Sequence, residues 1–334
     1  MQQSPISAAT VRKPVDIHVH IVGNGSGGSG CWLRVTGWHR PMAALMLRSL
    51  GLPGNALTQN LEEIYVELLL EQLRNSTVAT AVILAQDLVY DEEGKPLHDF
   101  GSFFVPNDYV LRLAAKHPEF LPAVSIHPAR PDALGELERC LAAGAVMMKC
   151  LPNCQNINCN DRRFQKFWER MAEARLPLLA HTGGEHTVPV FRREYADPHI
   201  LDLPLKCGVS VIAAHCATKS GLFDPEYFHK FAEMTKKFSN LYGDNSAFNV
   251  PIRGRHIPEC IREPLASRIV HGSDYPVPVH GHWSWMRGDV DWKTFRRWER
   301  QANVIERDYQ LKAAMGFPAE TFTRAWDLLR ISRS

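Results

Sequence analysis

Two histidines separated by one residue lie at the end of the first apolar segment of the chain. His18 and His20 belong to the run Val15–Ile21, which reads VDIHVHI. Alternate residues of a β-strand project to the same side, so a strand here would bring both imidazoles together. Neutral imidazole is a common ligand of divalent metals. An HxH pair is a weak signal by itself, because structural or accidental occurrences are common.

Further polar side chains follow other apolar runs, at the points where buried strands would end. These residues are Lys149, His181, His215 and Asp274. In an α/β barrel the C-terminal ends of the strands converge on one mouth, where active sites lie. We therefore predict that these four residues, together with His18 and His20, surround a divalent metal.

The strands that position these residues are predicted from eight apolar runs, each followed by a polar loop and a helical pattern. Several runs are nearly continuous in aliphatic residues, as expected for parallel strands buried on both faces. The runs are Val15–Ile21, Val78–Gln86, Phe120–His127, Ala145–Leu151, Leu176–Thr182, Val209–Cys216, Leu241–Ala247 and Arg268–Ser273. No GxGxxG loop follows a strand, which disfavours a dinucleotide-binding sheet.

The predicted helices alternate with these strands. They are Leu57–Arg74, Asn107–Lys116, Asp132–Ala143, Asp161–Ala174, Asp224–Lys237 and Glu259–Ala266, with two more near Trp298–Met315 and Ala319–Leu329. Such alternation indicates an α/β fold. The 334 residues exceed the roughly 250 that a barrel needs. We predict one (β/α)8 TIM barrel as a single domain over residues 1–334, with its core in 14–330 and extra C-terminal helices.

A long insertion, residues 23–57, separates the first strand from the first helix. Long loops at this face are often functional. It begins with a glycine-rich stretch from Gly23 to Gly30, interpreted as an edge of the pocket. The apolar segment Pro41–Leu50 is interpreted as a surface helix packed on the barrel; a lid or a dimer contact are the alternatives.

Charge and cysteine content exclude several function classes. The net charge of +2, from 38 basic and 36 acidic residues, gives no general attraction to nucleic acid or to an anionic membrane. Residues 1–14 lack the apolar core of a secretory signal. The eight cysteines are expected to be reduced thiols, so a cytoplasmic location is predicted. Cys150, Cys154 and Cys159 lack a second cysteine pair and are interpreted as inert.

Loop residues near the predicted mouth are candidates for contact with substrate. They are Glu185, Lys219, Arg253 and Arg255. An arginine could clamp a carboxylate or phosphate, although a solvated loop residue is the alternative. Asp244 could support a ligand histidine from behind. His271 is interpreted as structural, whereas His127 either lines the mouth or makes a structural hydrogen bond to a loop. The loop with His280, His282, Trp283 and Trp285 could shape the pocket or an oligomer contact.

The combination of these residues resembles the amidohydrolase superfamily. HxH on strand one, lysine on strand four, histidines on strands five and six and aspartate on strand eight match its pattern, and GSDYP at 272–276 is similar to the strand-eight signature of its amidohydrolase 2 branch. The resemblance covers about residues 15–330. It implies that His18, His20 and Asp274 bind one metal, and that Asp274 takes a proton from the attacking water.

The same resemblance leaves one or two metal ions open. His181 and His215 would bind a second metal, or one of them would bind the first while the other contacts substrate. Lys149 matches the position at which some members carry a carbamylated lysine that bridges two metals. Zinc is the expected metal, since it lowers the pKa of bound water from 15.7 toward about 7.

The expected activity is hydrolysis of a small carbonyl compound, an amide, lactone or ester. The alternatives are non-oxidative decarboxylation of a carboxylated aromatic, which the resemblance also allows, and a non-catalytic barrel that binds a metabolite. A small-molecule substrate is the expected partner. A homodimer is left open.

Overall fold

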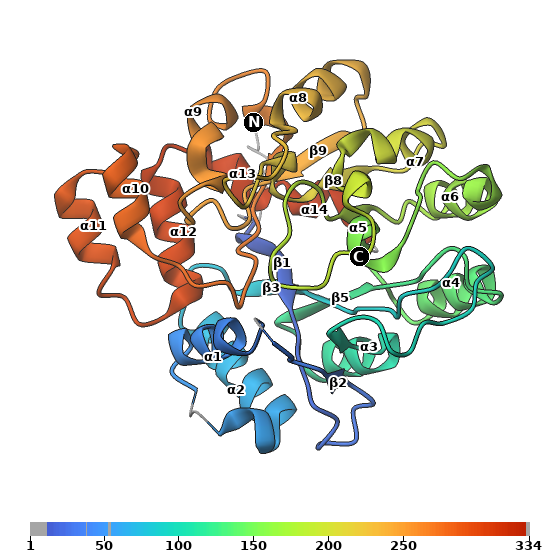
Figure 1. Ribbon diagram of the computed structural model, residues 1–334. Helices are drawn as coiled ribbons and strands as arrows, with labels where there is room; N and C mark the ends of the chain where they lie inside the picture. The colour runs from blue at the N-terminus through green and yellow to red at the C-terminus, as the bar shows by residue number, and fades with distance from the viewer. Residues whose placement is uncertain (1–11, 38, 53–54, 332–334) are drawn as a thin grey trace, which may run out of the picture.

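The computed structural model describes residues 12–37, 39–52 and 55–331, so the ends of the predicted domain, 1–11 and 332–334, lie outside the described residues. Its centre is a parallel sheet of eight strands surrounded by helices (Figure 1). In sheet order the strands are β1 (Val15–His20), β3 (Thr80–Leu84), β5 (Phe120–Val124), β6 (Met147–Cys150), β7 (Leu178–Ala180), β8 (Val211–Ala213), β9 (Leu241–Asp244) and β10 (Ile269–Val270).

Hydrogen bonds between the first and last strands close the sheet into a barrel. The Asp274 N–H donates to the His18 carbonyl at 2.9 Å, and the His20 N–H donates to the Tyr275 carbonyl at 2.9 Å. The predicted TIM barrel is therefore confirmed. All eight predicted strands are present. Each is shorter than its apolar run, because residues at the end of the run, and in several cases at its start, lie outside the sheet.

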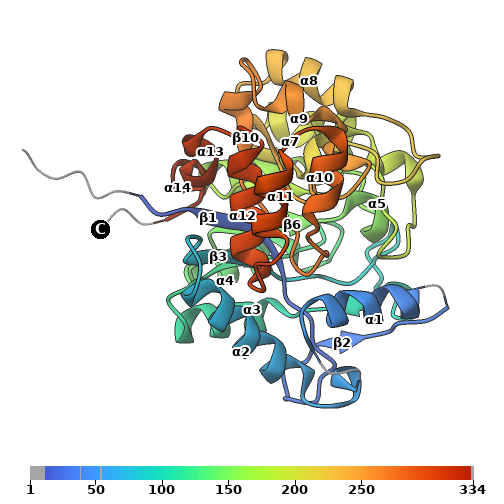
Figure 2. The same cartoon turned by 90° about the vertical axis from the view of Figure 1, so that its left-hand side faces the viewer.

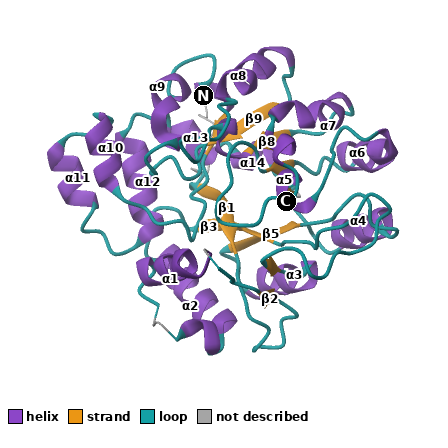
Figure 3. Cartoon of the chain, in the orientation of Figure 1, coloured by secondary structure: helices purple, strands orange, loops and turns teal. Residues whose placement is uncertain are grey.

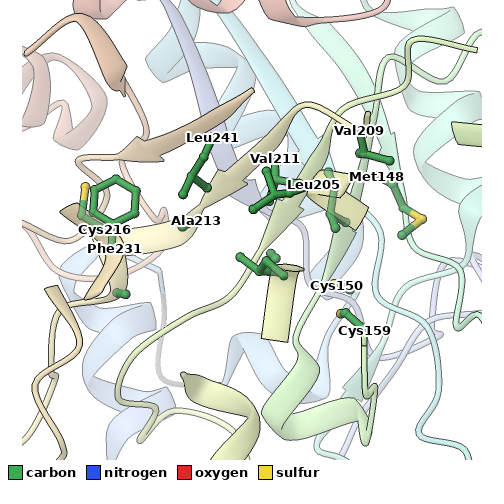
Figure 4. Close-up of a cluster of buried hydrophobic side chains, with 14 of the residues drawn as sticks. Met148, Cys150, Cys159, Leu205, Val209, Val211, Ala213, Cys216, Phe231 and Leu241 are labelled. Atoms are coloured by element: carbon green, nitrogen blue, oxygen red, sulfur yellow. The ribbon is translucent and has the colours of Figure 1, made fainter. Parts of the chain in front are cut away.

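Continuous apolar runs are explained by burial on both faces of each strand. In β8, Ile212 belongs to the cluster that fills the barrel interior, whereas Val211 and Ala213 belong to the cluster beneath the helices. Figure 4 shows part of this outer layer, in which Val211 and Leu241 lie near Leu205 of α7 (Asp202–Lys206). At the opposite end from the predicted mouth, Ala325 and Leu329 pack against the interior cluster.

The helices lie outside the strands (Figure 3). They are α1 (His39–Ser49), α2 (Leu61–Arg74), α3 (Asn107–Lys116), α4 (Ala133–Ala142), α5 (Pro152–Gln155), α6 (Gln165–Glu173), α7, α8 (Phe228–Lys237), α9 (Ile257–Cys260), α10 (Gly281–Arg287), α11 (Trp292–Trp298), α12 (Val304–Ala314), α13 (Ala319–Thr323) and α14 (Ala325–Leu328). Short 3₁₀ helices are η1 (Ala56–Thr58), η2 (Arg162–Phe164), η3 (Arg193–Ala196), η4 (Pro198–Leu201), η5 (Ala214–Ala217), η6 (Arg253–His256) and η7 (Ala266–Arg268). No described helix has both the length and the apolar character needed to cross a membrane.

Helix boundaries differ from prediction where prolines and caps intervene. The predicted helix Glu259–Ala266 is wrong: α9 ends at Cys260, and Pro264, which has no N–H and clashes with a preceding turn, lies before the separate turn η7. The predicted helix Trp298–Met315 begins late, because Asn303 caps α12 by accepting from the Glu306 N–H.

The insertion after β1 folds against the rest of the barrel. Its strand β2 (Trp32–Leu33) pairs antiparallel with β4 (Phe103–Phe104), a small sheet that the sequence did not reveal. Glu62 of α2 accepts hydrogen bonds from Gly25 and Ser29. The glycine-rich stretch is therefore held against α2, and the interpretation of it as a pocket edge is wrong. In Figure 2, α1 and β2 lie on the side of the barrel away from α14.

Candidate metal centre

Three side chains from the two strands that close the barrel converge at its mouth. The Oδ1 atom of Asp274 lies 3.3 Å from Nε2 of His18 and 3.4 Å from Nε2 of His20. The ring centroids of the two histidines are 5.1 Å apart. The predicted HxH pair and the aspartate after strand eight therefore face one another.

The remaining predicted ligands surround this group. Nε2 of His215 lies 3.9 Å from Oδ2 of Asp274, and one ligand atom each from His18, His215 and Asp274 fall within 4.8 Å of one another. Nζ of Lys149 is 3.0 Å from Nε2 of His18. The His181 ring lies 5.1 Å from that of His215. The structure thus brings all six predicted side chains to one place.

Asp244 at the end of β9 holds two of the histidines in position. Its Oδ2 lies 2.8 Å from Nδ1 of His18, and its Oδ1 accepts from the His215 N–H at 2.7 Å. Ser246 Oγ bonds both to Asp244 and to Nδ1 of His215, the latter at 2.8 Å. With Nδ1 engaged, each ring presents Nε2 to the centre, an arrangement typical of outer-shell support for ligand histidines.

Asp16 is a second buried carboxylate with a positioning role, and the sequence reading assigned it none. Its Oδ1 accepts from the backbone N–H of His18 at 3.0 Å and of Ser273 at 2.9 Å, so it ties β1 to the loop after β10. Burial raises its pKa to about 7. Its position two residues before His18, on the same strand, is the one signal by which sequence could have found it.

Burial sets the charge of the clustered groups. It lowers the pKa of His18 and of Lys149, and it lowers that of His181 to about 4 even though Glu185 acts in the opposite direction. Burial raises the pKa of Asp274, but His18 and His20 outweigh it and hold that carboxyl below its usual range. At neutral pH His18 and His181 are therefore neutral imidazoles and Asp274 is a carboxylate, the forms that bind divalent metals.

Backbone strain accumulates where the strands end. His215, Cys216 and Ala217 have consecutive φ values of 58, 50 and 56°, and Asp274 has a φ of 67°. Such left-handed conformations cost about 1–3 kcal/mol for residues other than glycine. The cost is offset by bonds such as those from the Thr218 N–H and hydroxyl to the His215 carbonyl. Strain at these sites turns the side chains toward the mouth.

A buried ion pair behind β10 supports the Asp274 segment. Lys312 of α12 donates to Asp308 at 2.7 Å and to the Gly272 carbonyl at 2.6 Å, and it is fully buried. Burial raises the pKa of Asp308, whereas Lys312 favours its ionised form. The pair therefore connects α12 directly to the strand end that carries Asp274.

Removing one partner of this pair is expected to destabilise the fold. In Lys312→Met the Asp308 carboxylate loses its counter-ion in a buried site, so we expect the free energy of unfolding to fall by about 3 kcal/mol. Chemical denaturation measures it. Lys236→Met, which removes an exposed ion pair with Glu233, is the matched control and should barely change stability. A Lys312→Met loss as small as the control's would contradict the assignment.

The metal-ligand cluster opens into a cavity of about 1020 Å³, counted with the space open to solvent. His20, Lys149, His181, His215 and Asp274 line its inner part. Met42, Ala43, Met46 and Leu47 of α1 line its outer part. The segment predicted as a surface helix therefore also forms part of the cavity wall, as the lid alternative requires.

Of the four predicted substrate contacts, Glu185 lines the cavity and the other three are not among the described residues that line it. Glu185 lines the cavity, with its Oε2 3.4 Å from Nε2 of His181. Arg253 is buried and donates to the Thr218 and Gly184 carbonyls, so it joins two loops beside the site. Arg255 is exposed and Lys219 is half-buried, and neither is among the described residues that line the cavity.

Other histidines have mainly structural surroundings. Nε2 of His127 bonds to the Gln155 carbonyl, and His271 is buried against Phe322. His280 and His282 approach Glu299, which also accepts from the Gly281 N–H at the start of α10. The histidine-rich loop is thus largely a helix start rather than part of the cavity.

The chain's own donor set fits a divalent metal. Nε2 of His181 is buried and has no hydrogen-bond partner among the described residues, which is unusual for a polar atom unless a ligand satisfies it. Nitrogen and carboxylate donors suit zinc and similar ions. His18, His20 and Asp274, with His215, His181 and Lys149 around them, are the residues that would hold it.

Comparisons with known proteins gave a match to one family model and to solved structures of similar fold. A family model described as Amidohydrolase, of the amidohydrolase 2 type, matches residues 15–299. A search of curated proteins found no significant match. An uncharacterised TIM-barrel protein of Bordetella bronchiseptica has a similar fold, with a TM-score of 0.58, 17% identity and coverage of 91% of this chain and 99% of that chain.

Two further solved structures share the fold. A probable 2-pyrone-4,6-dicarboxylic acid hydrolase of Acinetobacter baumannii, with citric acid bound, has a TM-score of 0.53 at 13% identity and covers 91% of this chain and 99% of its own. An amidohydrolase of Burkholderia multivorans with bound HEPES has a TM-score of 0.52 at 12% identity, covering 95% and 99%. At these identities the likeness concerns the fold.

Proposed function

The chain belongs to the amidohydrolase family, and from this premise we propose that it is a metal-dependent hydrolase of a small carbonyl compound, an amide, lactone or ester. The observation that carries the proposal is the meeting of Asp274 with three imidazoles. Its two oxygens lie 3.3, 3.4 and 3.9 Å from Nε2 of His18, His20 and His215. A carboxylate among imidazoles at a barrel mouth suits hydrolysis.

Each residue has a task in the proposed reaction. A divalent ion, for which zinc is the candidate, would acidify a water molecule and polarise the substrate carbonyl. Asp274 accepts the proton of the attacking water and passes it to the leaving group. Asp244 keeps His18 and the His215 backbone in place, and Glu185 lies beside His181, with its Oε2 3.4 Å from the His181 Nε2. The α1 helix limits the access of bulk water to the carbonyl.

Lys149 decides between one and two metal ions. Burial lowers its pKa and so favours the neutral amine, which is the form that attacks carbon dioxide. A bond forms between Nζ and the carbon of carbon dioxide, a proton leaves the nitrogen, and the product is an anionic carbamate. The carbamate would supply anionic oxygen ligands for two ions, which the unmodified amine does not offer.

Carbamylation is expected to be visible in the mass of the intact protein. Native mass spectrometry in bicarbonate buffer should show one carbon dioxide adduct, which acid treatment removes. Lys149→Met should lack the adduct under the same conditions. A wild-type protein without it would remove the two-metal form and leave a single-ion centre.

The function is tested by metal removal and restoration. Formation of the carboxylic acid product from a panel of amides, lactones and esters is measured before chelation, after chelation and after addition of zinc. We expect hydrolysis to be lost on chelation and to recover when zinc is added. Carbon dioxide release from a carboxylated aromatic, with no hydrolysis of the panel, would instead indicate the decarboxylase. Protein purified without chelators that contains no metal would support the non-catalytic barrel.

A further inference from the structure

The outer part of the cavity is formed almost wholly by apolar side chains. They come from the insertion after β1, from the start of α2 that follows it, and from the strand β4, which is distant in sequence. The main contributors are Leu33, Met42, Met46, Leu47, Leu61 and Phe103. Leu47 and Leu61 are buried, and the other four are half-buried around the open space.

Charged groups are scarce in this outer part. Among the described lining residues, Lys149, Glu185 and Asp274 belong to the inner, metal-binding end. Arg34 is the cation of the outer part, but it is exposed at the rim, lies over the Trp32 ring at 4.5 Å and donates to the His98 carbonyl. A second carboxylate on a substrate would therefore find no buried cation here to balance its desolvation.

Phe103 marks the point at which the apolar part meets the metal centre. Its ring stands edge-on to that of His20, with centroids 6.3 Å apart. A carbonyl at His20 and Asp274 would thus have its substituent directed along Phe103 toward α1. There Met42 and Met46, one helical turn apart, offer flexible apolar side chains that adapt to different shapes.

We propose that the substrate carries an apolar substituent, an alkyl chain or aryl ring, next to its reactive carbonyl, and that α1, β2 and Phe103 form the subsite for it. This inference rests on the proposed function, since it places the carbonyl at the metal centre. It separates this site from one built for a compact polycarboxylate, whose outer groups would need cations.

The test uses hydroxamic acids, which chelate an active-site metal and vary in chain length. Calorimetric titration of zinc-loaded protein with acetohydroxamate and hexanohydroxamate compares two probes that differ by four methylenes. Burial of those methylenes is expected to tighten binding on the order of 100-fold. Succinohydroxamate, which ends in a carboxylate, is expected to bind more weakly than hexanohydroxamate.

Two variants on the same helix locate the effect. Met46→Glu introduces a carboxylate into the subsite and should weaken hexanohydroxamate at least about tenfold while leaving acetohydroxamate unchanged, which also shows that the protein is folded. Leu45→Glu, at a side chain 59% exposed and outside the cavity, is the matched control and should change neither.

The outcomes separate the two proposals. Hexanohydroxamate that binds no better than acetohydroxamate, or less well than succinohydroxamate, overturns the apolar subsite and leaves the hydrolase proposal standing. Failure of every hydroxamate to bind zinc-loaded protein overturns the proposed metal centre, and the subsite inference with it. Equal weakening by Met46→Glu and Leu45→Glu would also contradict the subsite.

Discussion

Replacing His18 by alanine is expected to lower the affinity of the protein for zinc by roughly 10³-fold or more. His18 is 1% exposed, its Nδ1 is held by Asp244, and its Nε2 faces Asp274. Loss of an outer-shell partner costs about 10–100-fold in metal affinity, so loss of a ligand itself should cost more. Competition with a chromophoric chelator measures the dissociation constant directly.

Two further variants show whether the loss of zinc affinity is specific to the barrel mouth. Asp244→Asn keeps the shape of the support but not its charge, so an intermediate loss of about 10–100-fold is expected. His199→Ala removes an exposed histidine outside the cavity and should leave affinity unchanged. Zinc binding by His18→Ala as tight as by His199→Ala would show that the cluster at the barrel mouth does not hold the metal.

The positions of the candidate ligands were predictable because each lies at the end of a strand, and a strand end can be recognised from the local sequence. A strand buried on both faces needs a nearly unbroken apolar run, so the first polar residue marks the strand end. Lys149, His181 and His215 were found by that rule alone. Parallel strands of one barrel end at the same mouth, which is why residues distant in sequence could be placed together without any knowledge of their contacts.

What the sequence concealed depends on long-range packing. β2 and β4 are short and take their register from each other across an interval of 69 residues between Leu33 and Phe103, so neither has a local pattern. The segment Pro41–Leu50 shows an apolar face but not the surface it covers. Arg255 and Lys219 lie in loops that follow strands, and neither is among the described residues that line the cavity.

The residues that support the candidate ligands were only partly predictable from the sequence. Asp244 and Ser246 lie at a strand end, where polar residues are expected, but their pairing with His18 and His215 depends on three strands meeting. Nothing in the sequence marks Lys312 as buried, because its burial depends on how α12 packs against β10. The sequence therefore identifies candidate metal ligands more readily than the residues that hold those ligands in position.

Replacing Asp274 by asparagine is expected to reduce turnover by about 10³-fold or more on whichever substrate of the panel the wild-type protein hydrolyses. The amide keeps the size of the side chain and an oxygen atom that can bind a metal ion, but it cannot accept the proton of the attacking water. Turnover and bound zinc are measured on the same samples, so that loss of the base is distinguished from loss of the ion.

Asp291→Asn is the matched control for this substitution. Asp291 caps α11 by accepting from the Thr294 N–H, a task that asparagine also performs, so activity and stability should stay close to wild type. Asp274→Asn that retains both its zinc and more than about a tenth of wild-type turnover would remove Asp274 as the base. The three imidazoles would then remain a metal site, and another group, of which Glu185 is the nearest carboxylate lining the cavity, would have to take the proton.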